Sequence, residues 1–254
     1  MAKLSKADAN NHNRAMDLVN SDKKLTEDEK EFILNKYNPN ATNLTSIAGA
    51  FFTPKSIAIE FAHFADPKGV IVDLCAGIGS LSYWILKFDS WSGRTPDGWA
   101  SAEIEKLYCV EFNPEYATVG KRILPQATWI QGSCLNESII NQLPFADCVI
   151  SNPPFGSINS NDNINWIKYN SKANFDLNIV SIGTQIANAG CFILPKGKTC
   201  YDVDKHEAIE TGIHQEFLEK TGFMIQPSSW DLSEFENDWY GAKPKIEFTT
   251  FEKA

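Results

Sequence analysis

The sequence predicts an α/β protein, with a doubly wound and mostly parallel sheet of seven strands and a helical N-terminal extension. From residue 70 onward, short apolar runs alternate with longer amphipathic stretches, which is typical of strand–helix units in a parallel sheet. A turn with two glycines follows the first of these runs. The first fifty residues are polar and have helical periodicity instead.

Helix signals dominate the N-terminal part. Thr26 and Glu29 form a capping-box pattern ahead of apolar residues at helical spacing, and the Asn-Pro-Asn sequence at 38–40 ends that helix. After Ala-Phe-Phe-Thr-Pro at 50–54, the apolar periodicity of 57–64 predicts a helix that leads into the sheet. We therefore expect a helical extension over residues 1–65 and an α/β domain over residues 66–254.

The remaining elements follow the alternation of the apolar runs. Strands are expected at 70–74, 107–110, 128–131, 147–151, 190–194, 223–227 and 246–251, and helices near 79–87, 114–122, 136–142, 176–187 and 205–220. Two insertions interrupt this series, at 90–106 and 156–174. The second is rich in Asn and Ser, so it should be a surface loop.

Composition excludes several classes of protein. A net charge of -9 and a pI near 5.0 argue against a broad basic surface for nucleic acid, although a local basic lining remains compatible. The six cysteines include no CxxC pair and the four histidines show no ligand spacing, so we expect reduced thiols and no structural metal. The polar N-terminus and the lack of a ~20-residue apolar run predict a cytoplasmic protein without a membrane partner.

Three features mark a candidate site at the carboxyl ends of the strands. Asp73 to Ser80, with Gly77 and Gly79, forms a turn between a strand and a helix that allows close approach of a ligand, although a plain tight turn remains an alternative. Glu111 ends the next strand, where a carboxylate can accept ribose hydroxyls or simply be solvated. It lies 38 positions after Asp73, beyond the ~20 of the dinucleotide fingerprint, and the 90–106 insertion accounts for the excess.

The third feature is Asn152-Pro153-Pro154-Phe155, directly after the fourth apolar run. In a sheet that is wound outward from its first strand, strands one and four are neighbours, so Asp73, Gly77 and Asn152 should converge on one cleft. The Asn152 side-chain oxygen and the Pro153 carbonyl could each accept a hydrogen of a planar exocyclic amine, which increases electron density on its nitrogen. Phe155 could stack on the attached ring.

Together these motifs resemble the amino-methylating group of class I S-adenosylmethionine-dependent methyltransferases, which have a Rossmann-like fold. The resemblance spans about residues 24–195 and is strongest to the N6-adenine DNA methyltransferases of phages and mobile elements. It implies S-adenosylmethionine as cofactor and residues 66–254 as the catalytic domain. No separate target-recognition domain is expected.

The resemblance also implies roles for individual residues. Cofactor-binding positions would be Phe52, Thr53, Pro54, Asp73, Ala76, Gly77, Gly79, Glu111, Ser133 and Cys134, and the catalytic corner would be Asn152, Pro153, Pro154 and Phe155. The sequence departs from the family after the third strand. An Asp that binds the cofactor adenine is common there, whereas this chain has Gln131-Gly132-Ser133-Cys134, so Ser133 or a backbone N–H must substitute.

Target recognition would depend on less specific signals. Candidate substrate-binding residues are Trp166, Lys168, Tyr169 and Lys172 in the second insertion and Lys196 and Lys198 after the fifth strand, although the two last could lie in a solvated loop. The acidic, aromatic stretch at 230–240 is expected to be a surface loop over the core. A partner chain or a second copy of this chain could supply further recognition.

The function with the best support is N6-methylation of adenine in DNA, with the base rotated out of the duplex. N6-adenine methylation of RNA is the alternative, because it would use the same cofactor site and the same Asn-Pro-Pro-Phe corner. Methylation of a protein glutamine is less favoured, since Tyr is usual at the position of Phe155. A methyltransferase fold that only binds remains a further alternative.

Overall fold

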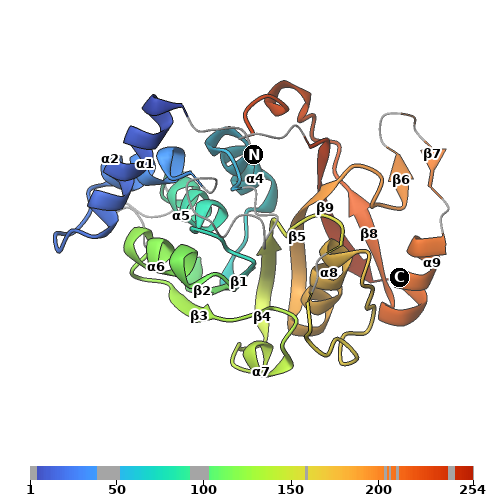
Figure 1. Ribbon diagram of the computed structural model, residues 1–254. Helices are drawn as coiled ribbons and strands as arrows, with labels where there is room; N and C mark the ends of the chain where they lie inside the picture. Colours follow the sequence, from blue (N-terminus) through green and yellow to red (C-terminus); the bar gives the residue numbers. More distant parts are fainter. Residues whose placement is uncertain are drawn as a thin grey trace.

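The computed structural model contains a sheet with helices on both faces (Figure 1). It describes residues 5–38, 52–91, 103–157, 160–202, 205, 207–209, 212–239 and 244–253. The strands of this sheet are β1 (Gly69–Leu74), β2 (Ile104–Glu111), β3 (Thr128–Gln131), β4 (Ala146–Ser151), β5 (Ala187–Pro195), β8 (Phe223–Pro227) and β9 (Ile246–Lys253). They coincide with the seven predicted runs, although β2 and β5 start three residues earlier than expected.

The strand order is β3-β2-β1-β4-β5-β9-β8. Strands β1 to β5 run parallel to one another, and β9 lies between β5 and β8, antiparallel to both. The predicted doubly wound, mostly parallel sheet is therefore confirmed. The order reverses between β1 and β4, where Leu74 pairs with Ser151, so both strands end at the same crevice.

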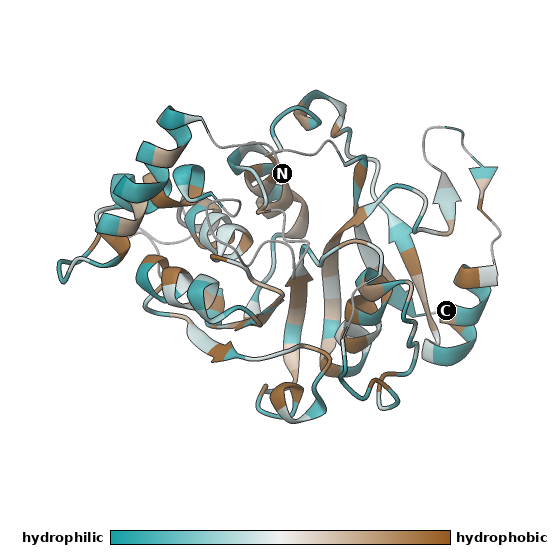
Figure 2. Cartoon of the chain, in the orientation of Figure 1, coloured by the Kyte–Doolittle hydropathy of each residue, from teal (hydrophilic) through white to brown (hydrophobic). Residues whose placement is uncertain are grey.

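Two layers of helices cover the sheet. The helices of the α/β part are α4 (Lys55–Ala65), α5 (Ser80–Trp91), α6 (Pro114–Ile123), α7 (Glu137–Ile140), α8 (Phe175–Ile186) and α9 (Gly212–Thr221). Ile71 of β1 belongs to one core cluster with residues of α4, α5 and α6, whereas its neighbour Val72 belongs to a second cluster with residues of α7, α8 and α9. Side chains alternate across a strand, so each strand feeds both cores, and the strands carry long brown stretches in Figure 2.

The helical N-terminal extension consists of α1 (Lys6–Val19) and α2 (Glu27–Lys36) before α4. The predicted capping box is present, since Thr26 Oγ1 accepts from Glu29 N and the Glu29 carboxylate accepts from Thr26 N. Arg122 of α6 donates to backbone carbonyls of the α1–α2 connection at Val19, Ser21 and Lys23. Buried residues of both helices share a core cluster with Ile71 of β1, so the extension packs directly against the α/β part.

One helix boundary differs clearly from the sequence prediction. The helix expected over 205–220 begins only at Gly212, and β6 (Tyr201–Asp202) pairs with β7 (Glu207–Ala208) in front of it. Ile209 N extends this pairing by donating to Cys200 O. Here the antiparallel pairing of two short strands that are neighbours in the sequence prevails over the helical pattern.

Part of the predicted organisation lies outside the described residues, namely the 38–40 helix stop beyond Asn38, residues 50 and 51 of the 50–54 segment and 92–102 of the first insertion. The stretch at 230–240 forms a short 3-10 helix, η2 (Ser233–Phe235), and Leu232 and Trp239 are buried against the core. Among the described helices, none is long and apolar enough to cross a membrane.

Candidate functional site

The turn between β1 and α5 forms the floor of the candidate site. Gly77 and Gly79 adopt φ values of +58° and +86°, a region that side chains disfavour. A Cβ on Gly77 would lie 3.3 Å from the ring of Phe52, and one on Gly79 would lie 3.0 Å from Leu124. Ala76 N donates to Val110 O of β2, which ties the turn to the neighbouring strand. The backbone at both glycines therefore lies so close to neighbouring side chains that a larger residue would be crowded there.

Glu111 reaches from the end of β2 into this turn. Its carboxylate accepts hydrogen bonds from Gly77 N at 2.8 Å and from Asn113 N at 2.7 Å. Burial raises the pKa of Glu111, and the backbone N–H donors oppose that rise. An acceptor carboxylate is thus fixed beside the glycine turn, as a ribose site requires.

Asp73 lies beneath the turn and is only 1% exposed. One carboxylate oxygen accepts from Ser82 Oγ at 2.6 Å, and the other has no hydrogen-bond partner within the described residues. Burial, aided by the negative charge of Glu111 and opposed by the Ser82 hydroxyl, raises the pKa of Asp73 to about 7. The carboxyl group can therefore change its protonation near neutral pH when a cation is placed beside it.

The segment Phe52–Pro54 covers the glycine turn and leads directly into α4. Phe52 packs edge-on against Tyr116, with ring centroids 4.9 Å apart. Thr53 is 7% exposed, and its carbonyl accepts from Ser80 Oγ at 2.9 Å. Pro54 is the N-cap of α4. The segment is consequently held at the start of both α4 and α5.

The corner Asn152-Pro153-Pro154-Phe155 leaves β4 beside this segment. Asn152 Nδ2 donates to Thr53 Oγ1 at 2.8 Å, which joins two parts of the chain 99 positions apart. The preceding Ser151 is fully buried and donates to Leu74 O of β1. Phe155 is partly buried and packs against the core cluster of α4 and α5. The pairing of Leu74 with Ser151 thus puts Asn152 beside the end of β1, as predicted from the strand order, and its contact with Thr53 is an addition that the strand order did not predict.

Ser133 and Cys134 follow β3 at the opposite side of the turn. Cys134 Sγ lies 3.8 Å from Cys75 Sγ of the turn. Ser133 Oγ donates to Asp162 Oδ2 at 2.6 Å, so a carboxylate of the 156–174 insertion meets the end of β3. Asp162 was not singled out from the sequence. The sequence offered Ser133 or a backbone N–H in place of the family's Asp, and the lack of an Asp at 131–134 is the signal in the sequence that bears on this position.

The candidate substrate-binding residues are not equivalent. Lys168, Lys172 and Lys196 are exposed, whereas Trp166 is half-buried and donates to Leu135 O. Lys198 is also half-buried, since it donates to Asn174 Oδ1 at 2.6 Å and lies 3.8 Å from the buried carboxylate of Asp176.

The prediction for Tyr169 is wrong. Its side chain is 1% exposed and packs against Phe217 of α9, with ring centroids 5.2 Å apart, so it belongs to the core. The insertion is therefore anchored by an apolar contact that its polar composition did not indicate.

No group of three or more residues of metal-ligand type is found in the part of the chain that the structure describes.

Comparison with known proteins adds independent findings. A family model described as N-6 DNA methylase matches residues 21–178. A comparison with curated proteins finds no match.

Solved structures share the fold. A protein from Pyrococcus horikoshii proposed to be an RNA methyltransferase is 18% identical, with a TM-score of 0.52 and coverage of 97% of this chain and 99% of that chain. A type I restriction-modification methyltransferase subunit from Streptococcus thermophilus is 16% identical, with a TM-score of 0.60, and 89% of this chain matches 48% of that chain. This chain thus spans about half of that subunit.

A third structure, from Listeria monocytogenes, is proposed to be a class I S-adenosylmethionine-dependent methyltransferase. It is 15% identical to this chain with a TM-score of 0.58, and the match covers 99% of this chain and 81% of the Listeria monocytogenes protein. Its similarity supports the class I fold over the whole length of the sheet.

Proposed function

Because the chain belongs to the N-6 DNA methylase family, we propose that it transfers a methyl group from S-adenosylmethionine to N6 of adenine in DNA. The chain is a methyltransferase of the S-adenosylmethionine-dependent class. The observation that best supports an amine as the methyl acceptor is the hydrogen bond from Asn152 to Thr53. It places the amide of the Asn-Pro-Pro-Phe corner beside Phe52–Pro54, which we call the cofactor segment.

The residues of the site fit this cofactor. Gly77 lets the ring of Phe52 lie close to the turn, since a Cβ there would meet it at 3.3 Å, and Glu111 presents a carboxylate suited to ribose hydroxyls. The buried Asp73 carboxylate has an oxygen that accepts no hydrogen bond from the described residues, which suits a cationic ammonium group. S-adenosylmethionine supplies a methyl group on a positively charged sulfur when it is bound.

The catalytic corner would act on the target amine. The Asn152 side-chain oxygen and the Pro153 carbonyl would accept its two hydrogens, and Phe155 would stack on the base. These acceptors favour electron density on the nitrogen that faces the methyl group and stabilise the positive charge that develops there. The proton is then lost from the methylated nitrogen, and no histidine base is needed.

Asp162 would complete the cofactor site. We assign to it the acceptor role for the cofactor's adenine amine, which in the resembling family is held by an Asp after the third strand. The support is its 2.6 Å contact with Ser133, the residue that follows β3 in this chain. Target recognition would involve Lys168, Lys172 and Lys196 and a partner chain, since the Streptococcus thermophilus relative is described as a subunit. The expected compartment is the cytoplasm.

The test is mass spectrometry of nucleosides from total DNA and total RNA of cells that express the wild type or Asn152→Ala. We expect N6-methyladenine to rise in DNA only with the wild type. A rise in RNA alone would replace the proposal with RNA methylation, for which the likeness to the Pyrococcus horikoshii protein is an argument. No rise in either would contradict nucleic-acid methylation.

A further inference from the structure

Helix α2 contacts the cofactor segment Phe52–Pro54 on both of its flanks. At one flank, the ring of Tyr37, the C-cap of α2, lies 5.8 Å from the ring of Phe52. At the other, Glu31 Oε2 accepts from the ammonium of Lys55 at 2.9 Å, and Lys55 directly follows Pro54. A helix of the N-terminal extension therefore spans the whole segment.

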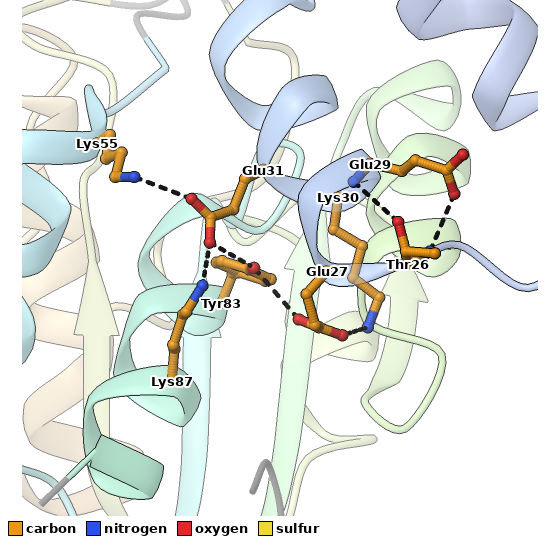
Figure 3. A network of polar contacts seen from close by, with 8 residues as sticks. All are labelled: Thr26, Glu27, Glu29, Lys30, Glu31, Lys55, Tyr83 and Lys87. Carbon is orange, nitrogen blue, oxygen red and sulfur yellow. Dashed lines mark hydrogen bonds and ion pairs between the residues drawn. The ribbon is translucent and has the colours of Figure 1, made fainter.

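Glu31 also joins this segment to α5. Its second carboxylate oxygen accepts from Lys87 and from the hydroxyl of Tyr83, both of α5 (Figure 3). The Lys55 ammonium lies 4.8 Å from the ring of Trp84 of the same helix. Ser80, the first residue of α5, also bonds to Thr53. The segment Phe52–Pro54 and its continuation at Lys55 are therefore connected to α5 at two points, through Ser80 and through Glu31.

The network is more than a set of exposed ion pairs. The side chains of Glu31 and Lys87 are only 19% and 15% exposed. Burial raises the pKa of Glu31, but the bonds and charges of Lys87 and Lys55 outweigh this effect and leave the pKa below its usual value. Loss of one charge in such a group leaves its partners poorly compensated, which costs more than the loss of an exposed pair.

We propose that Glu31 is a positioning residue, which holds Phe52–Pro54 against the glycine turn in the arrangement that binds S-adenosylmethionine. The segment has little freedom, since Phe52 contacts Gly77 and Thr53 bonds to both Ser80 and Asn152. A displacement of Lys55 is therefore transmitted to groups that surround the cofactor and the target amine. Helix α2 thus holds Phe52–Pro54 in place through Glu31.

The main experiment measures binding of S-adenosylmethionine and S-adenosylhomocysteine to Glu31→Gln by calorimetry. The variant keeps the shape of the side chain and removes the charge that Lys55 and Lys87 share. We expect both dissociation constants to rise about tenfold, a typical coupling between separate parts of a protein. A lower melting temperature with both dissociation constants unchanged would show a purely structural role and overturn the proposal.

Glu29→Gln is the matched control on the same helix. Glu29 bonds to Lys23 and to Thr26 N, but it makes no bond to α4 or α5 among the described contacts. The control should destabilise α2 and leave cofactor affinity within about twofold of the wild type, as is usual for surface sites. An equal loss of affinity in both variants would mean that general loosening of α2, rather than the Glu31 contact, is responsible.

A second variant, Lys55→Gln, keeps the proposal testable if Glu31→Gln does not fold. Lys55 is 44% exposed, so its replacement should disturb the core less. Lys55→Gln should also weaken cofactor binding. The double variant should bind the cofactor no more weakly than the single variant with the lower affinity, because both substitutions remove the same Glu31–Lys55 contact. Multiplied effects would contradict this coupling.

These measurements need no methyl acceptor. If the assignment of DNA as substrate is wrong, the proposed positioning role of Glu31 is not affected. If that role is contradicted, the assignment of the substrate is not affected.

Discussion

The proposed cofactor half and the proposed target half of the site differ in how they are built. In the cofactor half, which comprises the glycine turn, Glu111, the Phe52–Pro54 segment and the end of β3, groups are fixed largely through backbone atoms. Gly77 N, Ala76 N and Thr53 O all take part in hydrogen bonds to other elements. In the target half, Asn152 is fixed by Thr53, whereas Lys168, Lys172 and Lys196 extend from the surface.

This difference indicates where specificity can change. A site made of backbone groups at the ends of parallel strands depends on the fold itself, so it suits a cofactor that does not vary. Exposed lysines on loops can be replaced without loss of the core. We therefore expect substitutions at the glycine turn to act on affinity for S-adenosylmethionine, and substitutions in the Asn-Pro-Pro-Phe corner or at its contact with Thr53 to act on turnover.

Asn152→Ala tests this division with the largest expected effect. It removes an acceptor that matters mainly while charge develops on the target nitrogen, so kcat should fall by about three powers of ten. Affinity for S-adenosylmethionine, measured by calorimetry, should change little. An equal loss in both quantities would mean that Asn152 mainly holds the cofactor segment.

Thr53→Val separates the two roles of Asn152. It removes the hydroxyl that accepts from Asn152 Nδ2 and leaves the amide in place. Turnover should fall by about tenfold, the cost of roughly one hydrogen bond. Turnover as low as that of Asn152→Ala would assign the whole effect to orientation of the amide.

Gly77→Val tests the glycine turn, in the proposed cofactor half. A side chain at φ +58° is strained by ~1–2 kcal/mol, and its Cβ would meet the ring of Phe52 at 3.3 Å. Affinity for the cofactor should fall roughly tenfold, since each 1.4 kcal/mol is about a factor of ten. Gly222→Val is the control, because Gly222 has a φ of +76° with nothing within 4 Å. If both variants lose cofactor equally, general instability explains the loss.

The sequence predicts the strands and the glycine turn better than the contacts between separate segments, for a physical reason. The strands and the glycine turn follow from apolar runs and from the backbone freedom of Gly77 and Gly79, which are local properties. The contacts of Asp162 with Ser133 and of Tyr169 with Phe217 join segments that only the tertiary structure brings together. The β6–β7 pairing differs from these contacts, because the two strands are neighbours in the sequence, and it replaces the first part of the helix expected over 205–220.

Asp162→Asn tests the contact that the sequence did not reveal. If Asp162 accepts from the adenine amine, its replacement should weaken cofactor binding by about tenfold, as expected for a hydrogen bond to a charged acceptor. Glu137→Gln, an exposed acid at the start of α7, removes the same charge and should have no effect. The decisive comparison uses S-inosylhomocysteine, in which an oxygen replaces the 6-amino group. The wild type and Asp162→Asn should bind this analogue with similar affinity, because the group that Asp162 recognises is gone. A persistent tenfold difference would show that Asp162 acts only through Ser133 and the folding of its loop.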